Sequence, residues 1–398
     1  MKKVLLRGPL LSNSGYGIHS RQVFEYLITR KDIELKCDIL SWGNTSWHLK
    51  EYSDKSFLNI DKIIEKYMSK EEIDSLHDNE FNETYQVCFP NEWIKISNFD
   101  VGITAGVETT LCNPMWLKHI NLMDKIIVPS AFTKKTFLDT SKYHNIELST
   151  DIKMIPEYYH EELLLEANNT NILKNVSTKN NVLIFGQLTS TTPECDRKNI
   201  FSTIEVAIRE LSKYEDTGLI IKTNLGKNNF KDFINITKVF STYFSEIKKE
   251  LKDRTPKIYI LHGNMSPLEL KSLYESKKIK FLLSCTRGEG FGLTMLEAAI
   301  CGLPIVATNH SAYTEYLDYF LPIKHNMINI PEEKIDNNTF MKNSKWADFD
   351  SFTLETTIYN IFTKNSIDYE SVKSQKKNLI NKMSKTSIIS IYKSYISE

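Results

Sequence analysis

Residues 287–302 read RGEGFGLTMLEAAICG and form the most informative stretch of the chain. They follow Lys280–Ser284, a short apolar run of strand length. Glycines then interrupt the apolar pattern, and Leu293–Cys301 reads as a helix that is closed by Gly302. The stretch therefore predicts a strand, a glycine-rich loop and the start of a helix. Backbone N–H groups at a helix start are unpaired and attract phosphate, and glycines let such a ligand approach closely.

Two carboxylates, Glu289 and Glu297, lie eight residues apart in this stretch. Apolar residues surround Glu297, so its helix must be largely buried, and an ionised carboxylate there needs partners. Ribose or sugar hydroxyls would donate suitable hydrogen bonds, while the loop amides would hold phosphates between them. The alternative is that Glu297 forms an internal salt bridge and the glycines only make a tight turn. We favour the ligand-binding interpretation because of the sequence that surrounds the stretch.

Glu289 and Glu297, followed by Gly302-x-Pro304 and by Val306–Thr308, resemble the signature of the retaining glycosyltransferases of family 4, which have the GT-B fold. The resemblance covers the C-terminal half well and the N-terminal half more loosely. It implies that Glu289 and its loop contact the donor sugar and phosphates, and that Glu297 binds the nucleotide ribose. The loop backbone would contribute through Gly290, Phe291, Gly292 and Leu293.

Length and composition bound the class of protein. A chain of 398 residues predicts two or three domains, and 41% hydrophobic with 25% charged residues is ordinary for a soluble protein. Fifty basic and fifty acidic residues cancel, so no global field attracts nucleic acid or membrane. No apolar run approaches the roughly 18 residues that span a bilayer, and the start is too short in apolar length for a secretion signal. We expect a cytoplasmic protein, and leave open a peripheral contact with the inner face of the membrane.

Strands alternate with helices in two blocks of the chain, which predicts an α/β fold with parallel sheets. The expected architecture is GT-B, with two Rossmann-like domains that face a central cleft. The predicted bounds are 1–172 for an acceptor-side domain and 173–368 for a nucleotide-sugar domain, with a polar linker at 168–181. By resemblance, the segment 369–398 is a C-terminal helix that crosses back to the first domain.

A departing nucleoside diphosphate must be stabilised by cations or by a metal. No Asp-x-Asp lies in a metal-site context, so we expect no metal and no cofactor. The family places an Arg just after the first glycine of the second domain, but here Gln187 follows Gly186. Lys198 matches the family's Lys, and either Arg197 or Lys222 would take over the work of the missing Arg. The alternative is that Arg197 and Lys198 are a solvated pair and that Lys222 snorkels from a strand end.

The first domain offers weaker candidates. Gly15-Tyr-Gly17 lies where family members bring a glycine loop over the donor phosphates or the acceptor, and is otherwise only a flexible turn. Glu108 stands nearest to the position where relatives present a His. It is either an acceptor contact or a structural carboxylate. An acceptor platform, or alternatively part of the core, is predicted at Trp42, Trp47, Trp116 and His119.

The predicted function is a retaining glycosyltransferase of the hexosyltransferase type, which moves a sugar from a nucleoside-diphosphate sugar to a hydroxyl acceptor. The expected acceptor is a carbohydrate or a lipid-linked glycan in bacterial cell-surface polysaccharide synthesis. Lys198 with Arg197 would stabilise the leaving diphosphate, and Glu289 would orient the sugar. The sequence identifies no carboxylate nucleophile, which favours a front-face route. Two alternatives stay open: a non-catalytic nucleotide-sugar sensor or scaffold, which Gln187 would suit, and a glycoside phosphorylase, for which no pyridoxal phosphate pocket is evident.

Overall fold

The computed structural model describes residues 1–42, 45–47, 58–75, 80–166 and 172–397. The chain forms two compact units, each built around a parallel six-stranded sheet with helices, which confirms the predicted α/β class. Unit 1 comprises 1–158, 335–344 and 385–398, and unit 2 comprises 159–334 and 345–384. These bounds differ from the predicted boundaries after 172 and 368. Within the predicted linker, residues 168–171 lie outside the described residues.

The sheet of unit 1 has the strand order β2-β1-β3-β4-β5-β6, with every neighbouring pair parallel. Its strands are short and mostly buried, as expected for a parallel sheet that is covered on both faces. They span Lys2–Gly8 (β1), Ile33–Ile39 (β2), Glu83–Val87 (β3), Asp100–Ile103 (β4), Lys125–Val128 (β5) and Ile152–Met154 (β6).

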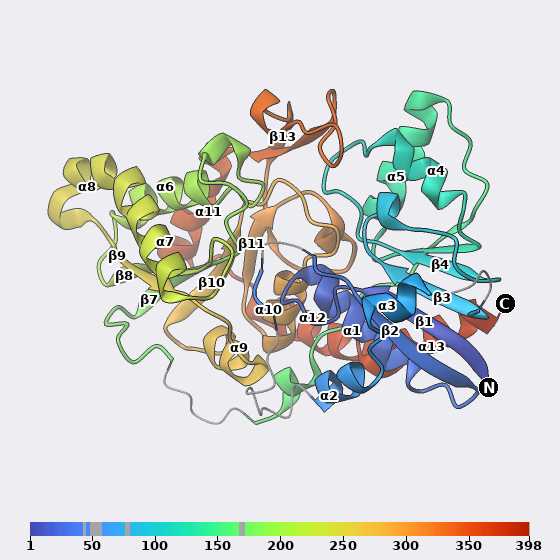
Figure 1. Cartoon of the computed structure of the whole chain (residues 1–398). Helices are drawn as coiled ribbons and strands as arrows, with labels where there is room; N and C mark the ends of the chain where they lie inside the picture. Colours follow the sequence, from blue (N-terminus) through green and yellow to red (C-terminus); the bar gives the residue numbers. More distant parts are fainter. Residues whose placement is uncertain (43–44, 48–57, 76–79, 167–171, 398) are drawn as a thin grey trace. The chain divides into compact units, whose positions relative to one another are not determined.

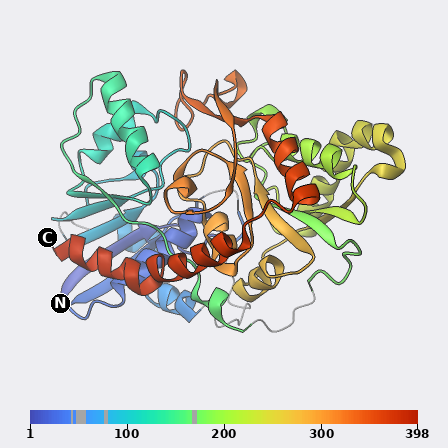
Figure 2. The same ribbon diagram turned by 180° about the vertical axis from the view of Figure 1, so that it is seen from behind.

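The helices of unit 1 are α1 (Gly15–Leu27), α2 (Leu58–Glu65), α3 (Lys70–Asp74), α4 (Pro114–Ile120), α5 (Ala131–His144) and α13 (Lys385–Ser397). The C-terminal helix α13 packs on this unit, as Figure 2 shows from behind. Its Tyr392 ring stacks on Tyr26 of α1 with the centroids 5.1 Å apart. The Tyr392 hydroxyl lies 3.4 Å from Nε2 of the buried His19. The last helix of the chain therefore belongs to the core of the first unit.

The sheet of unit 2 has the order β12-β11-β10-β7-β8-β9, again with parallel neighbours (Figure 1). Counted from its own first strand, this order is 6-5-4-1-2-3, the order of a dinucleotide-binding Rossmann sheet. The strands span Asn180–Phe185 (β7), Thr217–Lys222 (β8), Lys257–Leu261 (β9), Ile279–Ser284 (β10), Ile305–Thr308 (β11) and Leu321–Ile323 (β12).

Helices cover both faces of the second sheet (Figure 1). One face carries α6 (Ile200–Leu211), α7 (Phe230–Tyr243), α8 (Ser245–Leu251) and α11 (Ser351–Lys364). The other carries α9 (Pro267–Tyr274), α10 (Leu293–Cys301) and α12 (Tyr369–Lys382). Side chains alternate accordingly, since Val182 and Ile184 join the core under α6. Helix α9 begins with a capping box, in which the Ser266 and Glu269 side chains each accept from the other's backbone N–H.

Two further features complete the fold. An antiparallel hairpin, β13 (His325–Asn329) with β14 (Lys345–Phe349), follows the sheet of unit 2. The prediction of one helix over 369–398 is wrong, because the chain leaves helical geometry at Met383 and begins α13 at Lys385. Ser384 lies in this break and donates to the Asn381 carbonyl, a local bond that competes with helix continuation. None of the helices in the described part of the chain is long and apolar enough to cross a membrane.

Candidate active site

The two loops that matter most leave neighbouring strands of unit 2. Strands β7 and β10 pair side by side, although residues 186–278, which include strands β8 and β9, separate them along the chain. The connections of a Rossmann sheet diverge at this pair, which we call the switch point. Ligands of such sheets bind outside the carboxyl ends of the strands at the switch point. Residues 186–199 follow β7 and residues 285–292 follow β10, so both loops lie at this place.

The two loops meet through an ion pair. Lys198 Nζ lies 2.5 Å from Glu289 Oε1, and Arg197 Nη1 lies 3.9 Å from Glu289 Oε2. Arg197 also donates to the Gly288 carbonyl at 2.6 Å. Burial alone would raise the pKa of Glu289, but the charges of Lys198 and Arg197 outweigh burial and hold this pKa below its ordinary value. Glu289 is therefore an ionised carboxylate between two cations. The fold brings together three predicted site residues, whose roles stay predictions.

Residues near Ser311 support the Glu289 loop from the following strand. The Glu289 N–H donates to Ser311 Oγ at 3.1 Å, and the Ala312 N–H donates to the Glu289 carbonyl at 3.3 Å. Ser311 has φ 72° and ψ −169°, a conformation that residues other than glycine rarely adopt. This strained backbone fixes the main chain of Glu289 on both sides. Ser311 was not predicted as a site residue, because no local pattern in the sequence marks it.

A buried aspartate shapes the loop that carries Lys198. Asp196 Oδ1 accepts hydrogen bonds from the backbone N–H and the hydroxyl of Thr189, at 3.0 and 2.8 Å. Its Oδ2 accepts from the Ile200 N–H at 2.8 Å, at the start of α6. Asp196 is fully buried, so these bonds replace its water. Asp196 was not predicted as a site residue, because it lies three residues before the N-cap Asn199 and so outside the usual capping position.

The junction between the second loop and α10 brings the predicted backbone contacts together. Gly292 caps α10 at φ 88°, and the Tyr316 hydroxyl donates to its carbonyl at 2.7 Å. The Phe291 ring is buried and packs on the Tyr316 ring, so Phe291 can offer a ligand only its backbone. The first turn of a helix leaves its N–H groups without partners inside the helix. Gly290 to Leu293 thus form a compact turn suited to an anion.

Glu297 lies in the second turn of α10, as predicted, and is half-buried. Burial raises its pKa to about 7, although a hydrogen bond from the Tyr274 hydroxyl at 3.4 Å opposes this effect. Tyr274 ends α9 and is almost fully buried. A carboxyl group with this pKa is poised to ionise when a ligand brings hydroxyl donors to it.

Lys222 ends β8 and has other partners than Glu289. Its Nζ donates to the Gly263 carbonyl and lies 5.5 Å from the centre of the Phe185 ring. Burial lowers its pKa to about 8, and the charge of Glu269 only partly opposes this. Gln187, which stands where the family has an Arg, donates from Nε2 to the Leu225 carbonyl.

The predicted residues of unit 1 lie at the carboxyl edge of its own sheet. Gly15 and Gly17 belong to the first turn of α1, which follows β1, and not to a separate glycine loop. A Cβ on Gly17 would come within 2.1 Å of the Ser12 carbonyl oxygen, whereas one on Gly15 would meet nothing. Glu108 follows β4 and is half-buried; its charge adds to the effect of burial in raising the pKa of Tyr16.

Aromatic rings surround Tyr16 at this edge. The Tyr16 ring lies 4.7 Å from Trp42 and 5.3 Å from Phe89, and its hydroxyl is 2.7 Å from Thr104 Oγ1. Trp42 is half-buried and is the member of the predicted acceptor platform that joins this cluster. Including Trp116 in that platform is wrong, because Trp116 is fully buried beneath Phe89 and belongs to the core.

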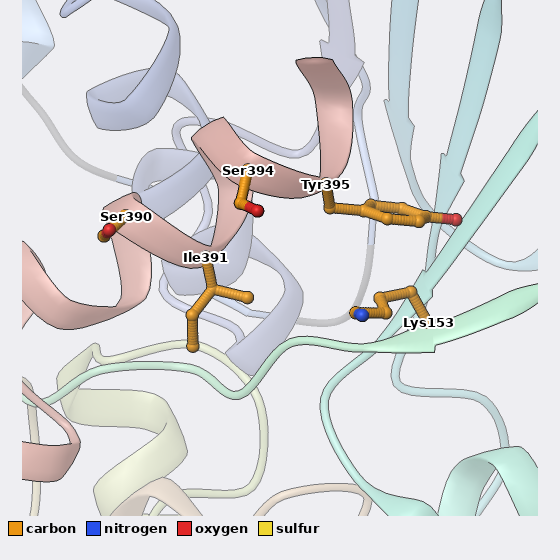
Figure 3. A pocket seen from close by; sticks show the side chains of 5 residues that line it. All are labelled: Lys153, Ser390, Ile391, Ser394 and Tyr395. Carbon is orange, nitrogen blue, oxygen red and sulfur yellow. The ribbon is translucent and has the colours of Figure 1, made fainter. Parts of the chain in front are cut away.

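A surface pocket of about 200 Å³ lies elsewhere in unit 1, between β6 and α13 (Figure 3). It contains none of the predicted site residues, and is lined by Lys153, Ser390, Ile391, Ser394 and Tyr395. Among the residues that the structure describes, no group of three or more His, Cys, Asp or Glu side chains could hold a metal ion. The expectation of a metal-free and cofactor-free reaction stays a prediction.

Comparisons with known proteins bear on the fold and on one segment. Residues 242–320 match the model of the family described as glycosyl transferases group 1. Sucrose-phosphate synthase from Thermosynechococcus elongatus has a similar structure, with a TM-score of 0.63, 12% identity and full coverage of both chains. The Anabaena HepE protein in complex with UDP-glucose gives the same values. An E. coli structure, described as trehalose-6-phosphate bound with UDP-2-fluoro glucose, has a TM-score of 0.62 and 11% identity over 99% of this chain and 98% of the other. No curated protein sequence matches.

These findings confirm the sequence predictions at a coarse level. The chain has the GT-B fold, and the segment that carries Glu289 and Glu297 matches the model of the glycosyl transferases group 1. The predicted enzyme class, a glycosyltransferase, is thereby supported. The assignment to family 4 and the roles of the individual residues stay predictions.

Proposed function

We propose that this chain is a retaining glycosyltransferase that moves a hexose-type sugar from a nucleoside-diphosphate sugar to a hydroxyl group of a carbohydrate or lipid-linked acceptor. The observation that carries the proposal is the meeting of Lys198, Arg197 and Glu289 at the switch point of unit 2, beside the first turn of α10. Two of the similar structures contain UDP-glucose or UDP-2-fluoro glucose, which supports a uridine diphosphate sugar as the donor.

Donor binding follows from the chemistry of the groups. A diphosphate carries negative charge, which Lys198, Arg197 and the amides of Gly290 to Leu293 complement. The ribose offers hydroxyl donors, and Glu297 is a half-buried carboxyl that would accept them once ionised. Lys222 and the Gly15 to Gly17 turn remain proposed contacts of the donor.

Cleavage of the bond between the sugar and its phosphate leaves negative charge on the phosphate oxygen and positive charge on the sugar carbon. Fixed cations and helix N–H groups stabilise the first charge best when no reorganisation is needed. Glu289 is ionised and would hold a sugar hydroxyl while its charge favours the cationic sugar.

Retention is proposed to follow a front-face route. The acceptor hydroxyl attacks the anomeric carbon from the side that the phosphate leaves, and the phosphate oxygen takes the hydroxyl proton. A double displacement would need a free carboxylate on the opposite sugar face. Glu289 is engaged by Lys198 at 2.5 Å, which suits an orienting carboxylate better than a nucleophile. Proton NMR of the anomeric signal in the product tests retention, because an inverted product would remove this route.

The first test is thermal unfolding with ADP, CDP, GDP and UDP and with their sugar conjugates. A ligand at about 100 times its Kd stabilises the folded state by about 2.7 kcal/mol. We expect one base to raise the unfolding temperature, and Lys198→Ala and Glu297→Ala to weaken that shift. Absence of any shift would overturn the donor site. Binding of the donor without turnover of any acceptor would instead favour the sensor alternative.

A further inference from the structure

Arg287 is an arginine that the proposed chemistry does not use. Its guanidinium is buried, with the residue 5% exposed. Nη1 donates to three backbone carbonyls of one short segment: Pro193 at 3.1 Å, Glu194 at 2.8 Å and Asp196 at 2.8 Å. The charge of this buried guanidinium is therefore compensated by backbone carbonyls, so we do not expect Arg287 to contact a ligand.

The other contacts of Arg287 reach the hairpin of unit 2. Its guanidinium carbon lies 5.1 Å from the centre of the fully buried Trp346 ring, and Nη2 lies 3.4 Å from Asp348 Oδ1. Asp348 Oδ1 also accepts from Asn199 Nδ2 at 3.0 Å, at the start of α6. The guanidinium of Arg287 thus packs on strand β14 through the Trp346 ring and is bonded to the same strand through Asp348.

The backbone of Arg287 joins the same parts. Its N–H donates to the Arg197 carbonyl at 2.9 Å, and its carbonyl accepts from the Ala347 N–H at 3.0 Å. Arg287 lies two residues before Glu289, and the segment it holds ends directly before Arg197 and Lys198. One residue therefore connects the loop of the carboxylate, the loop of the two cations and β14.

We infer that Arg287 is a positioning residue of the donor site, which sets the loop of Arg197 and Lys198 in register with the loop of Glu289. This inference rests on the proposed function for its effect on the donor, whereas the ordering of the loop stands without it. Displacement of charged groups by about 1 Å is enough to cost about 100-fold in rate. A lysine could replace the charge and part of the carbonyl bonding, but it has neither the planar face for Trp346 nor the second nitrogen for Asp348.

The first arm of the test needs no ligand. Hydrogen exchange by mass spectrometry would follow the amides of residues 187–199 in the wild type, in Arg287→Lys and in Asp348→Asn. We expect exchange in this segment to rise by about tenfold in Arg287→Lys, because local opening no longer breaks the guanidinium bonds. Asp348→Asn keeps the shape and should give a smaller rise. Unchanged exchange in both variants overturns the inference.

Two controls separate positioning from general loss of stability. Arg209→Lys makes the same chemical change at an arginine of α6 that pairs with Glu250 at 2.8 Å on the surface. Leu354→Ala removes a fully buried side chain of α11 and destabilises unit 2 from a helix that does not carry the loop. Neither should raise exchange in 187–199 when measured well below its unfolding temperature. A rise in Leu354→Ala equal to that in Arg287→Lys would overturn the inference.

The second arm links the loop to the donor. Calorimetry would compare UDP with uridine on the same variants. Misplaced cations should lower the affinity for UDP by about tenfold in Arg287→Lys. The affinity for uridine should stay the same, because Glu297 and not the loop would bind the nucleoside. Equal weakening of both ligands, or of neither, contradicts the positioning role in the donor site. Failure of the wild type to bind UDP or any other nucleoside diphosphate overturns the proposed function, and the exchange result still decides the ordering of the loop.

Discussion

Both sheets are parallel and differ in strand order, and the groups at their carboxyl edges differ in chemistry. At the edge of unit 2, the loops after β7 and β10 bring Lys198 to within 2.5 Å of Glu289. At the edge of unit 1, the start of α1 and the segment after β3 bring Tyr16 and Phe89 together, with ring centres 5.3 Å apart, and Trp42 joins them. The first edge is built from charges and the second largely from aromatic rings.

The comparison teaches that strand order gives the place of a site and loops give its chemistry. Fixed charges suit a diphosphate, whereas aromatic faces with a few neutral hydrogen-bond groups suit the ring of a sugar. We therefore propose that the edge of unit 2 binds the donor and that the edge of unit 1 contacts the acceptor. Each of the following predictions tests one side of this assignment.

The largest effect is expected from Lys198→Met. Its loss leaves Glu289 with Arg197 at 3.9 Å, and removes a cation from the leaving phosphate. Loss of one preorganised group that stabilises transition-state charge costs about 10²–10³ in kcat. Steady-state kinetics with the donor found in the nucleotide panel would measure this. Lys213→Met is the matched control, because Lys213 also lies 2.5 Å from a glutamate, Glu210, and is 60% exposed. Equal losses in both variants would contradict the assignment.

Gly17→Ala should give the next largest effect, on unit 1. The added Cβ would come within 2.1 Å of the Ser12 carbonyl, so the turn must shift. We expect a loss of about 1–3 kcal/mol in the free energy of unfolding, measured with urea. Gly15→Ala is the paired variant, since its Cβ meets nothing within 4 Å. It should keep or slightly raise stability, so a loss of turnover in it would report on ligand approach alone.

The pH dependence of nucleoside binding would sharpen the role of Glu297. Burial raises its pKa to about 7, so the carboxyl is protonated below this pH and ionised above it. Only the ionised form accepts hydrogen bonds from both ribose hydroxyls. Affinity for uridine should therefore fall by up to about tenfold for each unit that pH decreases below about 7. Calorimetry from pH 5.5 to 8 checks this, and Glu297→Gln should bind weakly at every pH. A flat profile in the wild type would remove Glu297 from the ribose.

The smallest effect is expected from Trp42→Leu in the aromatic edge. The ring packs on Tyr16 and Phe89, and Nε1 donates to Glu92 at 3.2 Å. Loss of one stacking face should raise KM for the acceptor by about tenfold or less and leave KM for the donor unchanged. Trp42→Phe keeps an aromatic ring, so its KM for the acceptor should lie between those of the wild type and Trp42→Leu. A change confined to the donor KM would reverse the assignment of the two edges.

Local patterns in the sequence were enough to predict much of the site. The strand, glycine loop and helix of residues 279–302 follow from their own residues, as does the capping box at Ser266. Lys198 was identified by resemblance. Its pairing with Glu289, 91 residues away, depends on β7 lying beside β10, which no local pattern contains.

Other parts could not be read from the sequence for physical reasons. Arg287 looks like an ordinary basic residue until the carbonyls of 193–196 and the Trp346 ring are brought to it by the fold. The strained backbone of Ser311 is imposed by tertiary structure. A glycine at this position would have suggested such a conformation, but a serine does not. The prediction of Trp116 as part of an acceptor platform was wrong, because the burial of a tryptophan depends on what packs over it, here Phe89.

Both units are built from discontinuous segments of the chain, which limits how they can be exchanged by engineering or by recombination between genes. Residues 335–344 and 385–398 belong to unit 1, although unit 2 precedes each of them in the sequence. An exchange of unit 2 for that of a relative would need four junctions, after 158, 334, 344 and 384. A single crossover between two genes would leave at least one unit mixed, with segments of that unit from each parent. We therefore expect donor and acceptor preferences to change by substitution within the loops, and not by shuffling of whole units.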